Sequence, residues 1–452
     1  MKAVTQYLKN RGFSCVDDSW YSRIQLWQSW YQGKVPAFHC YRQYNGRRKV
    51  VRTRKTLGMA KTISEDWANL ALNEKVDIVI SKATVNKRVH QVLDANNFRV
   101  RANQMLELAF ALGEGAFVEY LEGDSQVRID YLRAGLIYPL AWENGEVLDC
   151  AFASERAAGK EKQLTLTIHR RDEHGFYILE NHLFRENGGI LTELELPAGV
   201  KAEVATGSAV PLFQLIRPNI VNNADLSCPM GISVFANAID QLEGVDLVYD
   251  SYQNEFRLGR KRITVPTTMA RMMMEEDGSA APVFDDNDTE FYAVPAMEGG
   301  ENKIVEHNME LRHEAHEAAI KSGLALLSHK CGMGDDRYSF DHGQVKTARE
   351  VVSDKSDLFQ NLKKHELLLE RALVGLVQAI ASLLKLGTGF ETAVNFDDSI
   401  IEDADSTRQR DLQEVRDGIM KKWEFRVKWY GEDADAAKAM CPEDGPPEPD
   451  EL

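Results

Sequence analysis

Three long segments repeat apolar residues at intervals of three and four, the spacing that places side chains on one stripe of an α-helix. They cover residues 231–258, 305–330 and 347–386. At 1.5 Å per residue, the first would form a helix about 40 Å long and the third one about 60 Å long. The mean helix has only about 11–12 residues. The first two segments flank a short insertion, so the pattern predicts a helical hairpin with an elaborated tip.

The second and third segments differ in character. Residues 305–330 carry many charged and imidazole side chains on one side, so this helix faces solvent or lines an aqueous space. The third segment opens at Thr347 with Glu350 three residues later, which is a capping box. Gly375 lies inside this segment and allows a kink. The sequence ends the third helix at Gly387.

The insertion between the first two helices, residues 260–303, separates positive from negative charge. It opens with the basic stretch RKRITVP, predicted as a strand, and a short helix containing Met269 and residues 272–274 follows. From Glu275 to Glu301 there are nine carboxylates and no Lys or Arg, interrupted by a predicted strand at 291–294. Two interpretations stay open: a solvated loop, or a docking surface that excludes like-charged partners.

The rest of the chain mixes helices and strands, which predicts an α+β fold. Residues 1–40 predict an aromatic-rich helical arm, and residues 57–76 and 83–113 predict three more helices. The period changes to two between residues 115 and 216, which predicts an antiparallel β-rich region. A strand near 393–396 and a helix over 405–420 follow, and the acidic, proline-rich tail 442–452 is expected to be disordered.

Composition restricts the possible functions. The net charge of −16 argues against a protein that coats nucleic acid, yet allows one that surrounds DNA without gripping it. No run of 18 apolar residues exists, so a membrane span is not expected. Six scattered cysteines without a CxxC pair, and no secretory segment at the start, are typical of reduced thiols in a cytoplasm.

No motif in the chain predicts catalysis. His313 and His316 are three residues apart, whereas the metalloprotease motif places them four apart. Chelation by this pair with Glu317 is a weak alternative. The acidic run 285–288 lacks the glycine and the distal glutamate of a calcium-binding loop. No phosphate-binding GxxxxGK[ST] and no GxSxG are present. We therefore expect no catalytic residue, cofactor or metal, and look for function in shape and assembly.

The order of several segments is similar to that of the portal proteins of tailed bacteriophages, especially long-tailed phages of Gram-positive hosts. The resemblance covers nearly the whole chain and depends on the combination of the segments. They are WYQG at 30–33, RKTLGMAKTISEDWA at 54–68, LNEK at 72–75, RKRITVP at 260–266, VKTAREVVS at 345–353, FDDSI at 396–400, WEFR at 423–426 and YGED at 430–433.

The resemblance implies a portal-protein fold and a ring, usually of twelve subunits, at one vertex of the capsid. Double-stranded DNA would pass through its channel during packaging and ejection. The implied parts are a wing at 1–230, stem helices at 231–259 and 304–330, a clip at 260–303, a tunnel loop at 331–346, a long wing helix at 347–387 and a crown at 388–441. The acidic tail follows the crown.

The resemblance also implies partners and site residues. The partners are other copies of the chain, DNA, the terminase large subunit, a head-completion or adaptor protein, and the scaffolding and major capsid proteins. The protein would belong to a virion that is assembled in the host cytoplasm, and no membrane partner is expected. Candidate channel residues are Asp335, Asp336, Arg337, Asp341, Lys346, His313, His316 and Glu317. Candidate clip residues are Arg260, Lys261, Arg262, Arg271, Glu275, Glu276, Asp285 and Asp286. The alternatives are a monomeric helical scaffold or adaptor and a metal-dependent hydrolase.

Overall fold

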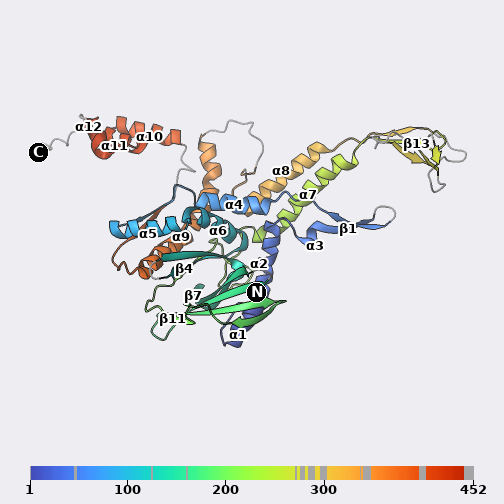
Figure 1. Ribbon diagram of the computed structural model, residues 1–452. Helices are drawn as coiled ribbons and strands as arrows, with labels where there is room; N and C mark the ends of the chain where they lie inside the picture. The colour runs from blue at the N-terminus through green and yellow to red at the C-terminus, as the bar shows by residue number, and fades with distance from the viewer. Residues whose placement is uncertain are drawn as a thin grey trace.

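The computed structural model shows an α+β body from which a long two-helix arm projects (Figure 1). The structure describes residues 2–44, 48–123, 126–158, 161–269, 272–274, 280–282, 291–295, 303–335, 337–338, 348–396 and 404–441. The fold class therefore agrees with the sequence prediction. Within the described residues, no helix combines the length and the apolar character that a membrane crossing requires.

Three helices open the chain: α1 (Lys2–Asn10), α2 (Asp18–Tyr31) and α3 (Pro36–His39). The Asp17 carboxylate caps α2 by accepting a hydrogen bond from the Ser19 amide at 2.8 Å. Trp20, Trp27 and Trp30 are each at most 4% exposed. The predicted aromatic segment therefore packs against the body, because its tryptophan rings are part of the main hydrophobic core.

A helical layer forms the centre of the body. It consists of α4 (Met59–Ala71), α5 (Ala83–Ala95), α6 (Phe98–Leu112) and the long α9 (Ala348–Leu383). Trp67 of α4 is fully buried and stacks on Phe110 of α6 with ring centroids 6.1 Å apart. At one edge of this layer, β3 (Asp77–Ile80) pairs antiparallel with β18 (Thr392–Asn395). Residues more than 300 positions apart thus close the body.

The predicted antiparallel region is confirmed and divides into two sheets. The smaller sheet has the order β12 (Phe213–Ile216), β4 (Gly115–Glu122) and β5 (Gln126–Arg133). In the larger sheet β6 to β10 follow one another, and β11 pairs with β9. Their bounds are β6 Ile137–Glu143, β7 Glu146–Ala158, β8 Glu161–Arg171, β9 Tyr177–Asn187, β10 Ile190–Leu194 and β11 Glu203–Ala205, with the short helix η1 (Ala134–Leu136) before β6.

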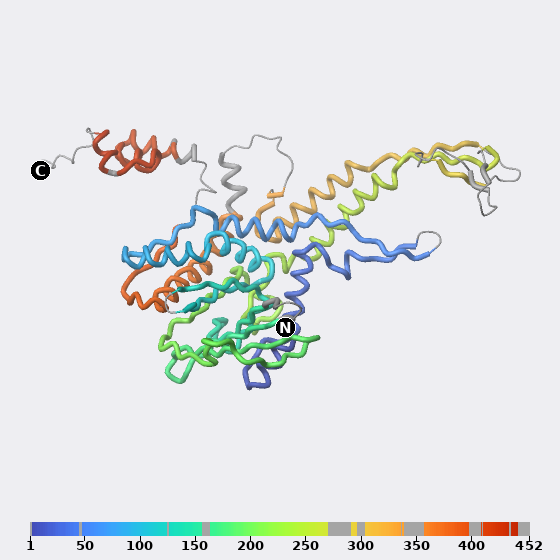
Figure 2. Tube along the Cα trace, viewed as in Figure 1, coloured from blue at the N-terminus to red at the C-terminus, as the bar shows by residue number. Residues whose placement is uncertain are grey.

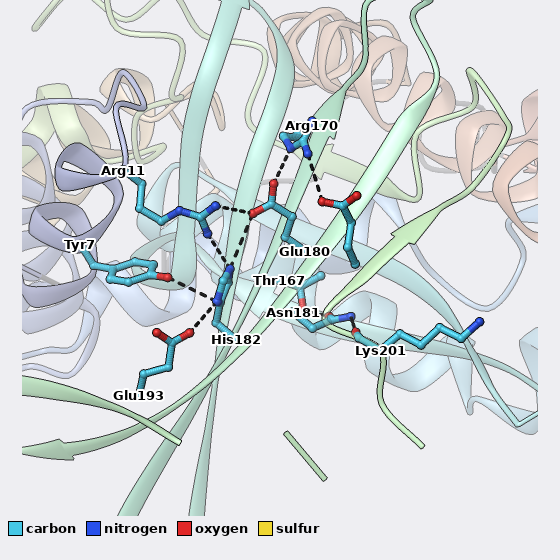
Figure 3. A network of polar contacts seen from close by, with 10 residues as sticks. Tyr7, Arg11, Thr167, Arg170, Glu180, Asn181, His182, Glu193 and Lys201 are labelled. Carbon is cyan, nitrogen blue, oxygen red and sulfur yellow. Dashed lines mark hydrogen bonds and ion pairs between the residues drawn. The ribbon is translucent and has the colours of Figure 1, made fainter. Parts of the chain in front are cut away.

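A polar network ties α1 to the larger sheet (Figure 3). Arg11 forms an ion pair with Glu180 of β9 at 2.8 Å and a hydrogen bond with His182 Nε2 at 2.7 Å. Because arginine only donates, His182 accepts at Nε2 and carries its proton on Nδ1, where Glu193 accepts at 2.9 Å. These contacts attach the first helix to strands that follow it by about 170 residues.

Two helix boundaries differ from the prediction. The first arm helix, α7 (Ile239–Leu258), begins eight residues late, after η2 (Ala236–Ala238). The backbone of Gly231 passes so close to that of Gly113 that a Cβ would overlap it, and the Gly231 amide donates to Glu114 at 2.9 Å. These contacts hold residues 231–235 outside the helix. The second arm helix, α8 (His313–Lys330), also begins late, because β17 (Val305–His307) pairs with β13 (Arg262–Pro266).

One other local prediction is corrected. Residues 272–274 form strand β14 (Met272–Met274), paired with β15 (Ala280–Pro282), where a short helix was predicted. Gly375 lies within α9, which is continuous from Ala348 to Leu383. A side chain at this position would overlap Gln214 of β12, so the glycine permits close packing of α9 on the small sheet. The predicted cap at Thr347 lies outside the described residues.

The C-terminal helices follow the predicted order. They are α10 (Ala404–Arg416), α11 (Lys422–Tyr430) and α12 (Ala434–Ala439). The Asp411 carboxylate, 2% exposed at its side chain, joins α10 to α11 by accepting from Lys428 at 2.7 Å and from Trp429 at 2.8 Å. Figure 1 shows these helices as a small group beside the body. The acidic tail 442–452 lies outside the described residues.

Candidate functional site

The two-helix arm is the most distinctive feature of the molecule. α7 and α8 run side by side away from the body (Figure 2). With 20 and 18 residues, they span about 30 and about 27 Å. Gly323 of α8 allows close contact with Val245 of α7, where an added Cβ would lie 3.1 Å from a valine methyl group. The buried apolar residues of both helices lie in the halves near the body: Leu242, Val245, Leu324 and Leu327.

The outer half of the arm exposes apolar surface. Phe256 and Leu258, at the outer end of α7, are 45% and 54% exposed. Leu326, in the half of α8 near the body, is also 62% exposed. An isolated arm of this kind leaves its helices covered on one side only. Such surface is typical of a contact with another protein or another copy of the chain.

An ion pair links α7 to the start of α8 at the outer end of the arm. Arg312, just before α8, binds Glu255 of α7 through two hydrogen bonds of 3.0 and 2.8 Å. This bidentate geometry lowers the pKa of Glu255 to about 2, and His316 adds a weaker contact at 3.7 Å. His316 therefore supports the helix pair, whereas His313 and Glu317 lie on the exposed surface of α8.

Two buried carboxylates fix the arm to the body. Asp246 of α7 accepts from His39 Nε2 at 3.1 Å and from the Leu57 amide at 2.7 Å. His39 Nδ1 accepts from the Val35 amide, so the ring donates to Asp246 in its neutral form. One turn later, Asp250 accepts from the Lys55 amide at 3.0 Å. The segment before α4 is thus bound directly to the base of α7.

The tip of the arm is a small sheet. β13 (Arg262–Pro266) lies between β16 (Phe291–Val294), which is parallel to it, and the antiparallel β17. Lys261 pairs with Glu306 at 2.8 Å, and the Arg262 guanidinium lies 5.8 Å from the centre of the Tyr292 ring. Arg260 is exposed. The predicted tip residues Arg271, Glu275, Glu276, Asp285 and Asp286 lie outside the described residues.

The loop after α8 returns to the body. Gly332 and Gly334 adopt positive φ angles of 78° and 77°, which glycine reaches without steric cost. Trp67 donates its indole N–H to the Cys331 carbonyl at 3.1 Å, and Asn361 of α9 donates to the Gly332 carbonyl at 3.1 Å. The first part of the loop is therefore held between α4 and α9.

The second part of the loop is bound by Asp66 of α4. Its carboxylate accepts from the Tyr338 hydroxyl at 3.0 Å and pairs with Arg337 at 3.3 Å. Burial, reinforced by Asp66, raises the pKa of Tyr338 above its ordinary range. Asp335 pairs with His329 at 2.9 Å. The candidate residues Asp336, Asp341 and Lys346 lie outside the described residues.

The sequence prediction missed the residues that position this loop. Asp66, Trp67 and Asn361 belong to helices whose patterns were interpreted only as packing surfaces. Their partners are 29 to 272 positions away in the chain, and no local pattern reports such contacts. Trp67 and Asp66 fall in the segment 54–68 on which the family resemblance rested, and that was the only available signal.

His313, His316 and Glu317 do not meet as ligands. Across the described residues, no group of three or more His, Cys, Asp or Glu side chains is placed to hold a metal ion. His316 is occupied by Glu255, and His313 contacts the Leu311 carbonyl at 3.3 Å. The arrangement of the arm, its tip and its loop offers contact surfaces and an elongated shape.

Comparison with known proteins identifies one family. The model of the family described as "Phage portal protein, SPP1 Gp6-like" matches residues 16–426. The match includes the arm, its tip, the loop after α8 and most of the C-terminal helices. A search of curated proteins gives no match.

Proposed function

Because the chain belongs to the phage portal protein family, SPP1 Gp6-like, we propose that it forms a ring around a channel for double-stranded DNA. The family is a structural one and places the protein in the virion, at a vertex of the capsid. The family match over residues 16–426 carries this proposal, and the projecting α7–α8 arm supports it. We propose twelve subunits, the number usual for the family.

Each part of the chain receives a proposed role. α7 and α8 are the stem, and the sheet of β13, β16 and β17 belongs to the clip. The loop from Cys331 is the tunnel loop, and α9 is the long wing helix. Of the predicted crown at 388–441, β18 pairs with β3 at an edge of the body, so we assign the crown role to α10, α11 and α12. Residues before α7 form the wing.

The surface of the stem suits a water-filled channel. His313 and Glu317 are exposed on α8, and the net charge of −16 on the chain repels phosphate, which would allow a duplex to slide. The passage needs no chemistry in this chain, so a separate ATP-consuming motor, the terminase large subunit, would drive the DNA. The clip is the proposed contact for that motor and later for a head-completion protein. Scaffolding and major capsid proteins would surround the ring during assembly in the host cytoplasm.

The tunnel-loop role has a direct test. Arg337→Glu reverses a charge at the end of the described loop and places a carboxylate against Asp66. We expect rings to form normally and heads to contain less DNA than wild-type heads. The control is Arg99→Glu, which makes the same charge change at an exposed position of α6. Equal DNA content in both variants and in wild-type heads would contradict the role assigned to this loop.

A further inference from the structure

A strongly basic segment stands out in an acidic chain. Residues 19–64 contain ten Lys and Arg and no Asp or Glu. The whole chain carries −16, so subtracting these ten positive charges leaves −26 on the remaining residues. Seven of the ten lie between residues 42 and 55, in and directly after a β-hairpin. No part of the proposed function so far uses this charge.

The hairpin is formed by β1 (Cys40–Tyr44) and β2 (Lys49–Thr53). Within the described residues, these strands pair only with each other. Tyr44 and Val51 are 63% and 69% exposed. A two-stranded hairpin alone in water is marginally stable, and its two outer edges offer unpaired backbone groups. The described hairpin therefore has the features of an element that is completed by a partner.

The root of the hairpin is rigid. Arg54 donates its backbone amide to the His39 carbonyl at 2.8 Å, and the amides of Lys55 and Leu57 bind Asp250 and Asp246 of α7. The strands then leave the body on the same side as the arm (Figure 2). Five residues per strand extend about 17 Å. The hairpin thus holds its positive charge at a fixed position beside the stem.

Negative charge lies on α8 and the segment before it, where the one arginine, Arg312, is already paired with Glu255 of α7. Glu306, Glu310, Glu314 and Glu317 are all exposed. Glu306 and Glu317 pair with Lys261 and Lys321 of their own chain. Among the described residues, Glu310 and Glu314 form no ion pair, and neither do Arg42 and Lys49 of the hairpin. Each chain therefore presents both halves of a charge-complementary contact that it does not itself complete.

A closed ring needs two different, complementary patches on every subunit, because each subunit contacts one neighbour through each patch. We propose that the β1–β2 hairpin of one subunit docks on the acidic outer face of the α8 segment, around Glu310 and Glu314, of the next subunit. This inference rests on the proposed ring. Opposite charges at these patches favour the correct neighbour and orientation and repel contacts between like patches.

A charge-reversal pair tests the inference. The hairpin variant is Arg42→Glu, Arg48→Glu and Lys49→Glu, and its matched control is Lys82→Glu, Lys87→Glu and Arg99→Glu, three exposed positions on or beside α5 and α6. Both change the net charge by the same amount. Mass measurement across a concentration series should show that the hairpin variant needs at least about tenfold more protein to form rings, whereas the control assembles like wild type. Wild-type assembly should also weaken as salt shortens the screening length from about 10 Å at 0.1 M to about 3 Å at 1 M.

Restoring the attraction identifies the receiving surface. Glu310→Lys with Glu314→Lys should impair assembly alone and recover it, at least in part, when combined with the hairpin variant. Normal assembly of the hairpin variant, or no recovery in the combination, would overturn the inference while leaving the ring intact. Binding of a 20-base-pair duplex by wild type but not by the hairpin variant, with unchanged rings, would assign the hairpin to nucleic acid and also overturn it. Absence of rings from wild type would instead contradict the proposed function.

Discussion

The contact between Asp246 and the segment before α4 provides the sharpest test of how the arm is fixed to the body. Asp246 is 4% exposed and accepts from His39 and from the Leu57 amide. Asp246→Ala removes both acceptors and leaves two buried donors without partners. Each buried donor left unsatisfied costs about 1–3 kcal/mol. Part of this cost is offset, because the variant no longer has to bury a carboxylate. We expect the free energy of unfolding to fall by about 3 kcal/mol.

The assay is urea unfolding of the unassembled protein, followed by tryptophan fluorescence. Trp30 lies 5.5 Å from the His39 ring, between ring centres, and so reports on this region. The urea concentration at half unfolding should fall. The dependence of the free energy of unfolding on urea concentration should stay constant, since the surface exposed on unfolding is unchanged. Hydrogen exchange gives a local measurement: the amide of Leu57 should exchange faster, because it loses its acceptor.

Asp240→Ala is the matched control. Asp240 is exposed in the first turn of the same helix, where its interaction with the helix dipole contributes at most about 1 kcal/mol. His39→Ala combined with Asp246→Ala should cost less than the sum of the two single changes, because both remove the same hydrogen bond. Equal midpoints for Asp246→Ala and Asp240→Ala would refute the reasoning.

Three further changes test other parts of the structure. Burial raises the pKa of Glu114 to about 7, so the folded state holds this proton more tightly than the unfolded chain and stability is lost as pH rises from about 4.5 to about 7. Glu114→Gln has no such proton, so its free energy of unfolding relative to wild type should rise by up to about 3 kcal/mol between pH 4.5 and pH 8. Urea unfolding at several pH values measures this difference, and the same pH dependence for both proteins would contradict the prediction. Gly113→Ala should lower the free energy of unfolding by about 2 kcal/mol or more, because Gly113 has φ +87° and an added Cβ would overlap the Gly231 backbone. The control Gly58→Ala, at φ +73° in open space, should cost about 1 kcal/mol. Similar melting temperatures for the two variants would refute the overlap. Asp66→Ala should leave global stability within about 1 kcal/mol but increase hydrogen exchange in the segment that contains Arg337 and Tyr338, and unchanged exchange would show that Asp66 does not hold the loop.

Local periodicity predicted most of the elements but not where the arm helices begin. The apolar repeat over 239–258 and 313–330 forms helices as expected. The predicted helical segments began earlier, at residues 231 and 305, yet Gly231 is held by Gly113 and Glu114, and Val305 is held by β13. Those contacts join segments separated by 41 to 118 positions. Helix propensity is a weak local preference, and such tertiary contacts override it.

The candidate site was predictable only as an outline. The helical patterns on either side of residues 260–303 predicted a hairpin with a tip, and the polar second pattern predicted a helix that faces solvent or an aqueous space. The residues that fix these parts, Asp246, Asp250 and Asp66, are carboxylates in helical patterns that resemble ordinary solvated positions. Their roles depend on the His39, Lys55 and Tyr338 groups that the fold places beside them. A single sequence does not encode such pairings in any local signal.

The central claim is that many copies of this chain stand around an opening wide enough for a DNA duplex. Electron microscopy of the purified protein, viewed down the symmetry axis and combined with its mass in solution, tests this most directly. The account predicts closed rings with a central hole and a mass that is a whole multiple of 51.0 kDa, twelve-fold if the family number holds. Particles of 51.0 kDa only, at high concentration and with capsid and scaffolding proteins present, would contradict it.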